Sequence, residues 1–516
     1  MVYNDSERAW AWGSSAHMFH NIYFPSKKEN SAMKNVLRTV TLLLLVMSML
    51  LTVACKKETS LANDDGGETV TSEDGKVLPF SKTDYKSELS IYYIDWGLYQ
   101  NFFFSEDTST DMNKAIYQRA DLVFDYLGVD VIGFKGSAGG LTYASEISNQ
   151  VLGGADTHQL VLTHCYQGLT TLIANGCLRD FNDFDLISLD ADYWNSELME
   201  SVEVQGSAYL GSSDFLIKDP NVIFFNKDVH ADYTQLENLY KLVEDKKWTL
   251  DKMFQMAAQI DVATEGAVED RTYGIVGKAD WQAVAFADAA DCNWVVDNGG
   301  YLELNMGPSN ERYLNVFEKI EESVDQSWFG LYGKQSAEEL TIASCKTLFS
   351  YESLQQAYKY KAKTGDSDGT EVNFGILPYP KYDELQENYR SLNWSGFMCV
   401  PKSVQNLEMV QKAMEALAFF SADTTVIAYY EKLLGARLAD KPEDAKMLDI
   451  IFDGIVANPF FNFMQGSSAD SSEYLFYGIT RMLEAKLANS TQVPSVSGLW
   501  NSYHSVAQAH LDKYLN

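Results

Sequence analysis

Aromatic rings beside carboxylate, amide and imidazole side chains carry the most informative chemistry in this sequence. The chain holds 10 Trp, 30 Tyr and 27 Phe residues. A flat ring can stack on the aliphatic C–H face of a sugar, while the sugar hydroxyls need polar partners. A ring flanked by Asp, Glu, Asn or His in a loop after a strand therefore suits a carbohydrate. The candidates that follow predicted strands are Trp96, His164, Tyr166, Tyr351 and Glu352.

Each of these side chains has a structural alternative. A tryptophan in a chain of this size can belong to the core or to the rim of a pocket. His164 can make a structural hydrogen bond as readily as a ligand contact. Trp248, in KKWTLDK, reads as a packing residue at the start of a helix.

Other kinds of chemical site find little support. The seven histidines are scattered, with no HExxH and no Cys/His cluster. TGDSDGTE has its glycine at the fourth position from Asp366, whereas a calcium loop needs it at the sixth. FKGSAGG lacks the Lys-Ser/Thr of a phosphate loop, and no Gly-x-Ser-x-Gly elbow occurs. We therefore expect no metal and no cofactor.

The elements that would position the candidate residues alternate between strands and helices. Residues 112–128 read as a helix that ends at Gly128, and residues 248–260 as a helix capped by Thr249. Asp440, with Pro442 in the first turn, opens a helix over residues 443–456. Further strands are predicted at 89–96, 129–134, 158–164, 221–227, 346–351, 373–380 and 396–401, and helices at 143–154, 407–422 and 475–488. This alternation predicts an α/β fold with largely parallel sheets.

Length and charge limit the domain organisation and the possible partners of the protein. The 516 residues exceed the roughly 250–300 over which one hydrophobic core keeps growing, so two lobes or domains are expected. The formal net charge of −32 argues against a nucleic-acid partner, because phosphates demand basic surface.

An export signal is predicted near the start of the chain. In MKNVLRTVTLLLLVMSMLLTVAC, residues 33–55, a short basic stretch precedes an apolar run that ends in small residues at Cys55. The run suits a signal peptide better than a permanent membrane span. Thr52 stands where lipoprotein signals usually carry Leu. We expect residues 33–54 to be removed and Cys55 to be lipidated, which would anchor the protein on the extracytoplasmic face of the cell membrane. Ordinary secretory cleavage and an uncleaved anchor are the alternatives.

The segments beside this signal differ from it. Residues 1–32 carry no export pattern, and we expect translation to begin at Met33, with residues 1–32 an incorrectly assigned extension. Residues 55–85 are mostly polar and rich in Gly and Asp, so we expect a flexible tether.

Cysteine usage does not indicate a disulfide framework. Apart from Cys55 there are five cysteines and no CxxC, and an odd number cannot all pair within the chain. Several have apolar neighbours, which favours small buried thiols. A pairing of Cys165 with Cys177 stays open.

Several segments, in the right order, resemble the extracellular solute-binding proteins of family 1, the capture subunits of ABC importers. NVIFFNKDVHADY resembles the family's strand followed by Asn-Lys-Asp. ENLYKLVEDKKWTLDKMFQMAAQI resembles its helix with a Trp-Thr start, and GFMCVPKSVQNLEMVQKAMEALAFFSA its late strand, Pro-Lys turn and long helix. The likeness spans about residue 88 to the C-terminus, and no single motif is diagnostic.

The resemblance implies a type II periplasmic-binding-protein-like fold, with two α/β lobes, crossover strands and a ligand cleft between the lobes. It assigns residues 86–222 and 397–440 to lobe 1, and residues 223–396 and 441–516 to lobe 2. The family often has a polar ligand contact at the position of Asp214, for which an Asx turn is the alternative. It also implies cleft positions for His164, Tyr166, Trp281, Tyr351, Glu352 and Trp394.

The function implied by the resemblance is capture rather than catalysis. A monomer would close about its hinge on a small solute, favoured here to be a carbohydrate, and deliver it to the permease subunits of an ABC transporter. A secreted glycoside hydrolase stays open as an alternative, because the 72 acidic residues could supply a catalytic carboxylate pair. A cell-surface glycan-binding protein or scaffold is the third reading.

Overall fold

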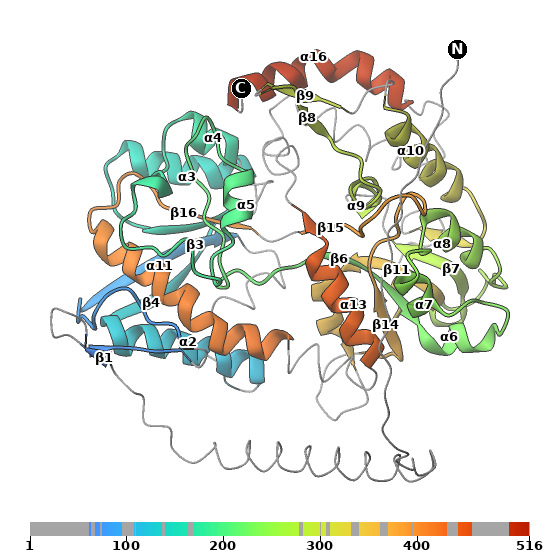
Figure 1. Cartoon of the computed structure of the whole chain (residues 1–516), viewed down its shortest axis with the longest axis horizontal. Coiled ribbons are helices and arrows are strands. Elements are labelled where there is room, and N and C mark those ends of the chain that lie inside the picture. The colour runs from blue at the N-terminus through green and yellow to red at the C-terminus, as the bar shows by residue number, and fades with distance from the viewer. Residues whose placement is uncertain are drawn as a thin grey trace, which may run out of the picture. The chain divides into compact units, whose positions relative to one another are not determined.

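Two α/β lobes, each built on its own sheet, make up the part of the chain that the structure describes (Figure 1). The computed structural model describes residues 61–62, 68–72, 75–94, 108, 110–136, 140–163, 169–277, 282–299, 301–305, 310–331, 340–361, 370–393, 396–430, 442–456 and 495–514. Both lobes belong to one unit, residues 60–516.

The sheet of lobe 1 is covered on both faces. Its strand order is β16-β5-β3-β4, with β16 antiparallel to its neighbour and the others parallel. The strands are β3 (Ser87–Ile94), β4 (Val129–Gly136), β5 (Leu160–Thr163) and β16 (Phe397–Cys399). One face meets α2 (Asp111–Leu127) and α11 (Leu407–Ser421), and the other meets α3 (Gly140–Leu152) and α4 (Leu169–Ala174). Leu89 and Ile91 pack on the first side and Tyr92 on the second, so both faces of β3 carry buried apolar side chains.

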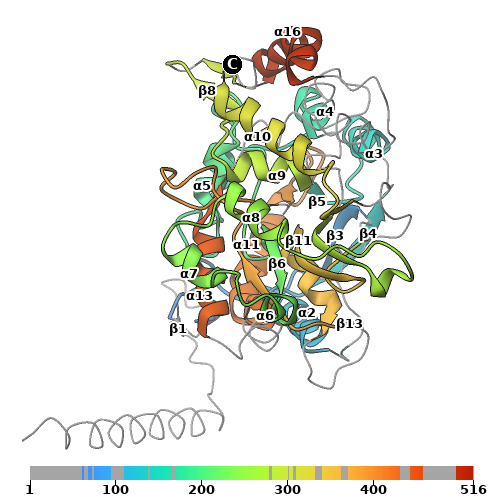
Figure 2. The ribbon, with the colours of Figure 1, turned by 90° about the vertical axis from the view of Figure 1, so that its right-hand side faces the viewer.

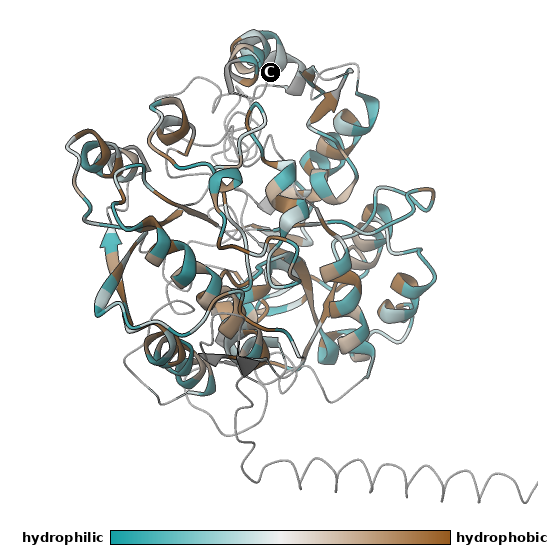
Figure 3. Cartoon of the chain, turned by 60° about the vertical axis from the view of Figure 1, so that its left-hand side comes forward, coloured by the Kyte–Doolittle hydropathy of each residue, from teal (hydrophilic) through white to brown (hydrophobic). Residues whose placement is uncertain are grey.

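Lobe 2 repeats this plan. Its sheet has the order β10-β7-β11-β6-β14, and β6 is antiparallel to both of its neighbours. The strands are β6 (Asn221–Asn226), β7 (Thr272–Gly277), β10 (Phe329–Leu331), β11 (Lys346–Ser353) and β14 (Phe374–Leu377). Ile223 and Phe225 share a core with α7 (Leu239–Glu244), α8 (Leu250–Ala257), α9 (Gln282–Ala289) and α10 (Glu311–Ser323). Figure 2 shows these helices in front of β6 and β11, and Figure 3 shows the mixed hydrophilic and hydrophobic colouring of amphipathic helices.

Smaller elements complete the described chain. Lobe 2 and the connections between the lobes hold most of them. They are β1 (Leu61–Ala62), β2 (Glu68–Thr69), α5 (Ser196–Ser201), α6 (Lys227–Asp232), β8 (Val295–Asp297), β9 (Leu302–Leu304), β12 (Tyr360–Lys361), β13 (Thr370–Glu371), β15 (Ser391–Leu392), α13 (Pro442–Asp453), β17 (Ile455–Val456) and α16 (Val496–Tyr514), with 3-10 turns at Phe181–Asp183, Val268–Asp270 and Leu354–Lys359 and a π-helical stretch at Ala422–Val426.

The predicted helix ends are confirmed where local chemistry sets them. Gly128 closes α2 in the left-handed region, at φ 60°. Thr249 caps α8, and its side chain accepts a hydrogen bond from the Lys252 N–H. The helix predicted over 443–456 ends earlier, at Asp453, because residues 455–456 pair with Ser391–Leu392 as a short strand. The predicted helix 475–488 lies outside the described residues.

Replacing Thr249 with alanine is expected to lower the free energy of unfolding by about 1 kcal/mol, because an orphan N–H of α8 loses its acceptor. Urea denaturation measures the change. Thr249→Ser keeps a cap oxygen and should retain most of the stability, so an equal loss in both variants would show that packing of the methyl group, rather than the cap, is responsible.

The second half of the predicted tether is packed on lobe 1. Leu78 and Phe80 are buried in the lobe 1 core, at 1% and 6% exposure. The N–H groups of Thr83 and Tyr85 donate to backbone carbonyls at the end of α2. Lys76 pairs with Asp192 across 3.1 Å. The prediction of a tether over residues 55–85 is therefore wrong for this packed stretch. It rested on the polar composition of the segment, which outweighed the two apolar side chains, so a flexible tether can only precede the stretch.

The predicted extension, signal peptide and lipidation site, including Cys55, lie outside the described residues. Among the residues that the structure does describe, no helix has both the length and the apolar character needed to cross a membrane.

Candidate binding site and hinge

The carboxyl ends of the parallel strands define the candidate site. In lobe 1 these ends are Ile94, Gly136 and Thr163. In lobe 2 they include Gly277 and Leu331, which are paired with each other. Ligands of open α/β sheets bind outside the carboxyl ends of the strands.

In the part of the chain that the structure describes, two crossovers connect these carboxyl edges. The first leads through Asp219 and Pro220 into β6, whose first residue, Asn221, pairs with Ser353 at the carboxyl end of β11. The second leads into β16, whose first residue, Phe397, pairs with Thr163 at the end of β5. Each crossover thus enters its new sheet as the antiparallel strand and at the carboxyl edge.

The two crossovers are hydrogen-bonded to each other. Pro220 and Asn393 form an antiparallel bridge, and the Asp219 N–H donates to Asn393 Oδ1 over 2.8 Å. The Asn221 side chain donates to the Leu392 carbonyl over 3.1 Å. Two hydrogen-bonded crossover segments of this kind can act as a short hinge, because bending them alters the angle between the two sheets that they join.

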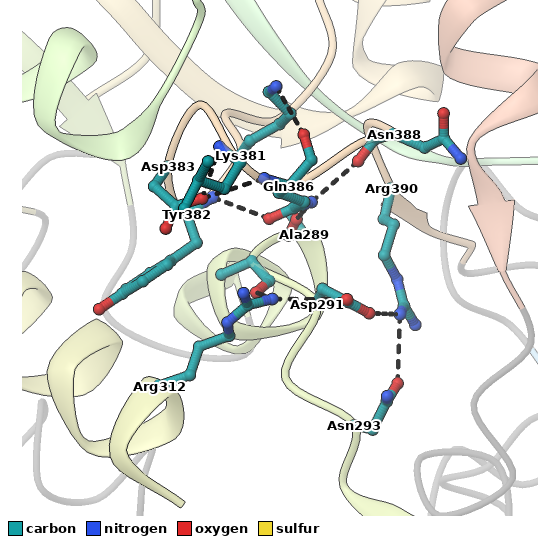
Figure 4. A network of polar contacts seen from close by, with 12 residues as sticks. Ala289, Asp291, Asn293, Arg312, Lys381, Tyr382, Asp383, Gln386, Asn388 and Arg390 are labelled. Atoms are coloured by element: carbon teal, nitrogen blue, oxygen red, sulfur yellow. Dashed lines mark hydrogen bonds and ion pairs between the residues drawn. The ribbon is translucent and has the colours of Figure 1, made fainter. Parts of the chain in front are cut away.

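Lobe 2 fixes the chain just before the second crossover (Figure 4). Arg390 binds Asp291, donates to Asn293 Oδ1 over 3.2 Å, and lies 3.9 Å from the buried Asp288. The Gln386 amide donates to the carbonyls of Ala289 and Asn388 and accepts from the Tyr382 N–H, and Lys381 Nζ donates to the Gln386 carbonyl. These bonds tie residues 381–390 to the end of α9 and to the residues that follow it.

Comparisons with known proteins support the fold, although their sequence identity to this chain is low. No protein-family model and no curated protein match the sequence. The GacH receptor of Streptomyces glaucescens, solved unliganded and with acarbose, is 15% identical with a TM-score of 0.53, covering 83% of this chain and 99% of its own. An ABC substrate-binding protein of Listeria monocytogenes in complex with cycloalternan is 12% identical with a TM-score of 0.54, covering 82% and 98%. An ABC transporter solute-binding protein of Thermotoga lettingae bound to α-D-tagatose is 13% identical with a TM-score of 0.54, covering 82% and 100%. The chain has the fold of the ABC-transporter solute-binding proteins.

Five of the predicted ligand residues of this solute-binding fold lie outside the described residues. In sequence they flank described strand ends. Trp96 follows the end of β3 by two positions, His164 follows β5 directly, and Trp394 follows Asn393 directly. The full set outside the described residues is Trp96, His164, Tyr166, Trp281 and Trp394.

Asp214 lies in lobe 1 shortly before the first crossover. Its N–H donates to the Tyr193 carbonyl over 2.8 Å. Burial raises the pKa of Asp214 to about 6, and the positive charges of Lys218 and Lys76 oppose that rise. A carboxylate in this state can accept hydrogen bonds at neutral pH, as a polar ligand contact requires.

Tyr351 and Glu352 stand at the carboxyl end of β11. The Tyr351 ring is 3% exposed and packs against Phe286 and Phe329, with centroids 5.2 and 6.1 Å away. This core packing favours a structural role for the ring. Glu352 is half-buried, and both of its carboxylate oxygens accept from the Tyr360 hydroxyl at 2.6 Å. Their contact with a ligand stays a prediction.

A hollow of about 750 Å³ in lobe 1 is a poorer site. It lies at the amino ends of β3 and β4, and its lining includes Glu88, Asp130 and Asp156. This is the edge opposite the carboxyl ends. Within the described ranges, no three or more His, Cys, Asp or Glu side chains are grouped to hold a metal ion.

The described cysteines are buried thiols, as predicted; Cys165 lies outside the described residues. They are Cys177, Cys292, Cys345 and Cys399. Burial raises the pKa of Cys292 and of Cys345 to about 12, so neither is an activated nucleophile.

Sequence reasoning missed the hinge residues. Asp219 contacts Gln355 and Asn393, which lie 136 and 174 residues after it in the chain. The one available signal is the Asp219-Pro220 dipeptide, directly before the apolar strand of residues 221–226. It reads as a turn and gives no hint of its partners.

Proposed function

We propose that this chain is an extracytoplasmic solute-binding protein that captures a small carbohydrate between its lobes and delivers it to an ABC permease. The observation that carries the proposal is the pair of hydrogen-bonded crossovers joining the carboxyl edges of the two sheets. A solute that contacts both edges stabilises the closed arrangement over the open one, which is all that capture requires. The sugars bound to the similar structures support the carbohydrate class.

The proposed organisation assigns residues 86–222 with 397–440 to lobe 1 and residues 223–396 with 441–516 to lobe 2. Lipid-modified Cys55 anchors the protein to the outer face of the membrane, and the tether ends before Val70, where the chain begins to pack on lobe 1. The protein works as a monomer without cofactor or catalysis. The ligand is held by Trp96, His164, Tyr166, Asp214, Trp281, Tyr351, Glu352 and Trp394.

A ligand screen with product analysis tests this function. Acarbose, cycloalternan, α-D-tagatose and a panel of mono- and oligosaccharides are added singly, and the melting temperature is recorded. A bound sugar at 100 times its Kd stabilises the folded state by about 2.7 kcal/mol, so the melting temperature should rise and the sugar should be recovered intact. Hydrolysed sugar would favour the glycoside hydrolase alternative. Melting temperatures unchanged by every sugar would contradict carbohydrate capture.

A further inference from the structure

Asp219 is a buried carboxylate at the meeting point of the two crossovers. It is 7% exposed, and its backbone N–H holds Asn393 of the second crossover at 2.8 Å. No described Lys or Arg makes an ion pair with it. Burying an ionisable carboxyl without a cation costs free energy, because the group loses its hydration. Hydrogen bonds within the protein must offset this cost, and they also hold the carboxyl in one position.

The same carboxylate also holds the end of β11. Asp219 Oδ1 accepts from the Gln355 N–H at 2.8 Å, and the Leu354 N–H donates to the Pro220 carbonyl at 2.9 Å. These residues directly follow the strand end that carries Tyr351 and Glu352. Asp219 therefore links the two crossovers through its backbone N–H, and links the first crossover to a strand end at the candidate site through its side chain.

The chain that follows α11 meets Asp219 as well. Tyr429 and Tyr430 are the titratable groups that face it, and their pKa values are raised by burial and, to a smaller extent, by the Asp219 charge. Lys218 adjoins Asp219 in sequence, and its backbone hydrogen-bonds Tyr430. Burial raises the pKa of Asp219 to about 7, opposed by hydrogen bonds from the Gln355 N–H and the Ser353 side chain.

We infer that Asp219 is a positioning residue of the hinge: its carboxylate holds the end of β11 against the first crossover, and this fixes the backbone N–H that binds the second crossover in the arrangement that solute binding requires. The inference rests on the proposed function, because positioning matters only where a solute bridges the two lobes. Asp219 itself need not touch the solute.

A matched control is available inside lobe 1. Glu415 is a second buried carboxylate, at 0% exposure, and it accepts from the Tyr193 hydroxyl at 2.6 Å and from Trp194 Nε1 at 2.7 Å. It lies on α11 and makes no bond to either crossover among the described residues. Losing it should lower stability without moving the hinge.

The first experiment separates affinity from stability. The Kd of the sugar that raises the melting temperature most in the screen is measured by calorimetry for Asp219→Ala, Asp219→Asn and Glu415→Ala. Asp219→Ala should weaken binding at least 10-fold. Asp219→Asn keeps an acceptor for the Gln355 N–H and should restore affinity to within about threefold. Glu415→Ala should melt earlier but bind within threefold of the unchanged protein. Unaltered affinity in Asp219→Ala, or an equal loss in Glu415→Ala, would overturn the inference.

The second experiment needs no ligand, so it decides the inference even if no sugar binds and the proposed function fails. Hydrogen exchange of the full chain is followed in peptides covering 216–222, 353–357 and 390–393. Asp219→Ala should exchange faster in all three, while Asp219→Asn and Glu415→Ala should match the unchanged protein there. Normal protection of the Gln355 peptide in Asp219→Ala would refute the link between crossover and strand.

The pH dependence of stability gives a further check with a definite sign. The folded-state pKa of Asp219, about 7, lies above its ordinary value of 3.8. The folded protein therefore holds this proton more tightly than the unfolded chain, and stability falls as the pH rises from about 4 to about 7. Asp219→Asn cannot ionise, so its melting temperature relative to the unchanged protein should be higher at pH 8 than at pH 5. Asp214 titrates nearby but is present in both proteins. If the difference in melting temperature between the two proteins did not vary with pH, the pKa of Asp219 would not be raised in the folded protein.

Discussion

Replacing Asp444 with alanine is expected to lower the free energy of unfolding by about 3 to 5 kcal/mol. Asp444 stands in the first turn of α13, and its side chain is 0% exposed. It pairs with Lys227 Nζ at 2.6 Å and accepts a hydrogen bond from the Tyr240 hydroxyl. Without it, a lysine whose side chain is 14% exposed loses its counter-ion, and α13 loses its bonds to Lys227 and Tyr240. Chemical denaturation measures the loss.

The same helix supplies the control for this prediction. Asp449 is exposed, and Asp449→Ala should change stability by less than about 0.5 kcal/mol. Asp444→Asn keeps the shape of the side chain but removes its charge, so it should fall between the two. A loss below 1 kcal/mol in Asp444→Ala would mean that Lys227 reaches water once its partner is gone, and that the pair adds little.

Local signals account for the parts of the fold that the sequence predicts well. Gly128, Thr249 and Pro442 set helix ends through their own backbone or side-chain chemistry, which acts within a few residues. β6 is apolar on both faces because both of its faces are covered. Neither kind of signal depends on distant parts of the chain.

The elements that were missed depend on distant partners. β7 reads TYGIVG and β10 only FGL, too short and too rich in glycine to indicate strands without their pairing. Residues 455–456 become a strand through Ser391–Leu392. Leu78 and Phe80 are two apolar residues in a polar stretch, and only the lobe 1 core explains their burial.

The candidate site shows the same division more sharply. Strand ends mark where ligand residues belong, so Trp96 and His164 can be proposed from sequence. The hinge is different, because Asp219 acquires its role only when Asn393 and Gln355 come beside it. Composition would class it as one of 72 acidic residues. Its burial together with its bonds to Asn393 and Gln355 distinguishes it, and both are properties of the folded chain.

Changing Cys55 to serine is expected to move the protein almost entirely from the membrane fraction to the soluble fraction. Two or more acyl chains on Cys55 would supply stable anchoring, since each buried methylene contributes about 0.8 kcal/mol and one chain alone binds only marginally. Serine cannot form the thioether. Fractionation followed by immunodetection, together with the mass of the N-terminal peptide, measures the effect.

Cys165→Ser is the matched control, because it removes a thiol from the body of the protein and should leave the protein on the membrane. If Cys55→Ser also stayed with the membrane, the apolar run of residues 40–53 would have to be an uncleaved anchor, the alternative that Thr52 leaves open.

The packed stretch around Phe80 determines which lobe the proposed anchor would hold. Because this stretch packs on lobe 1, a lipid on Cys55 would be connected to lobe 1 alone. Lobe 2 would then be free to move about the Asp219 hinge while lobe 1 stays near the proposed permease.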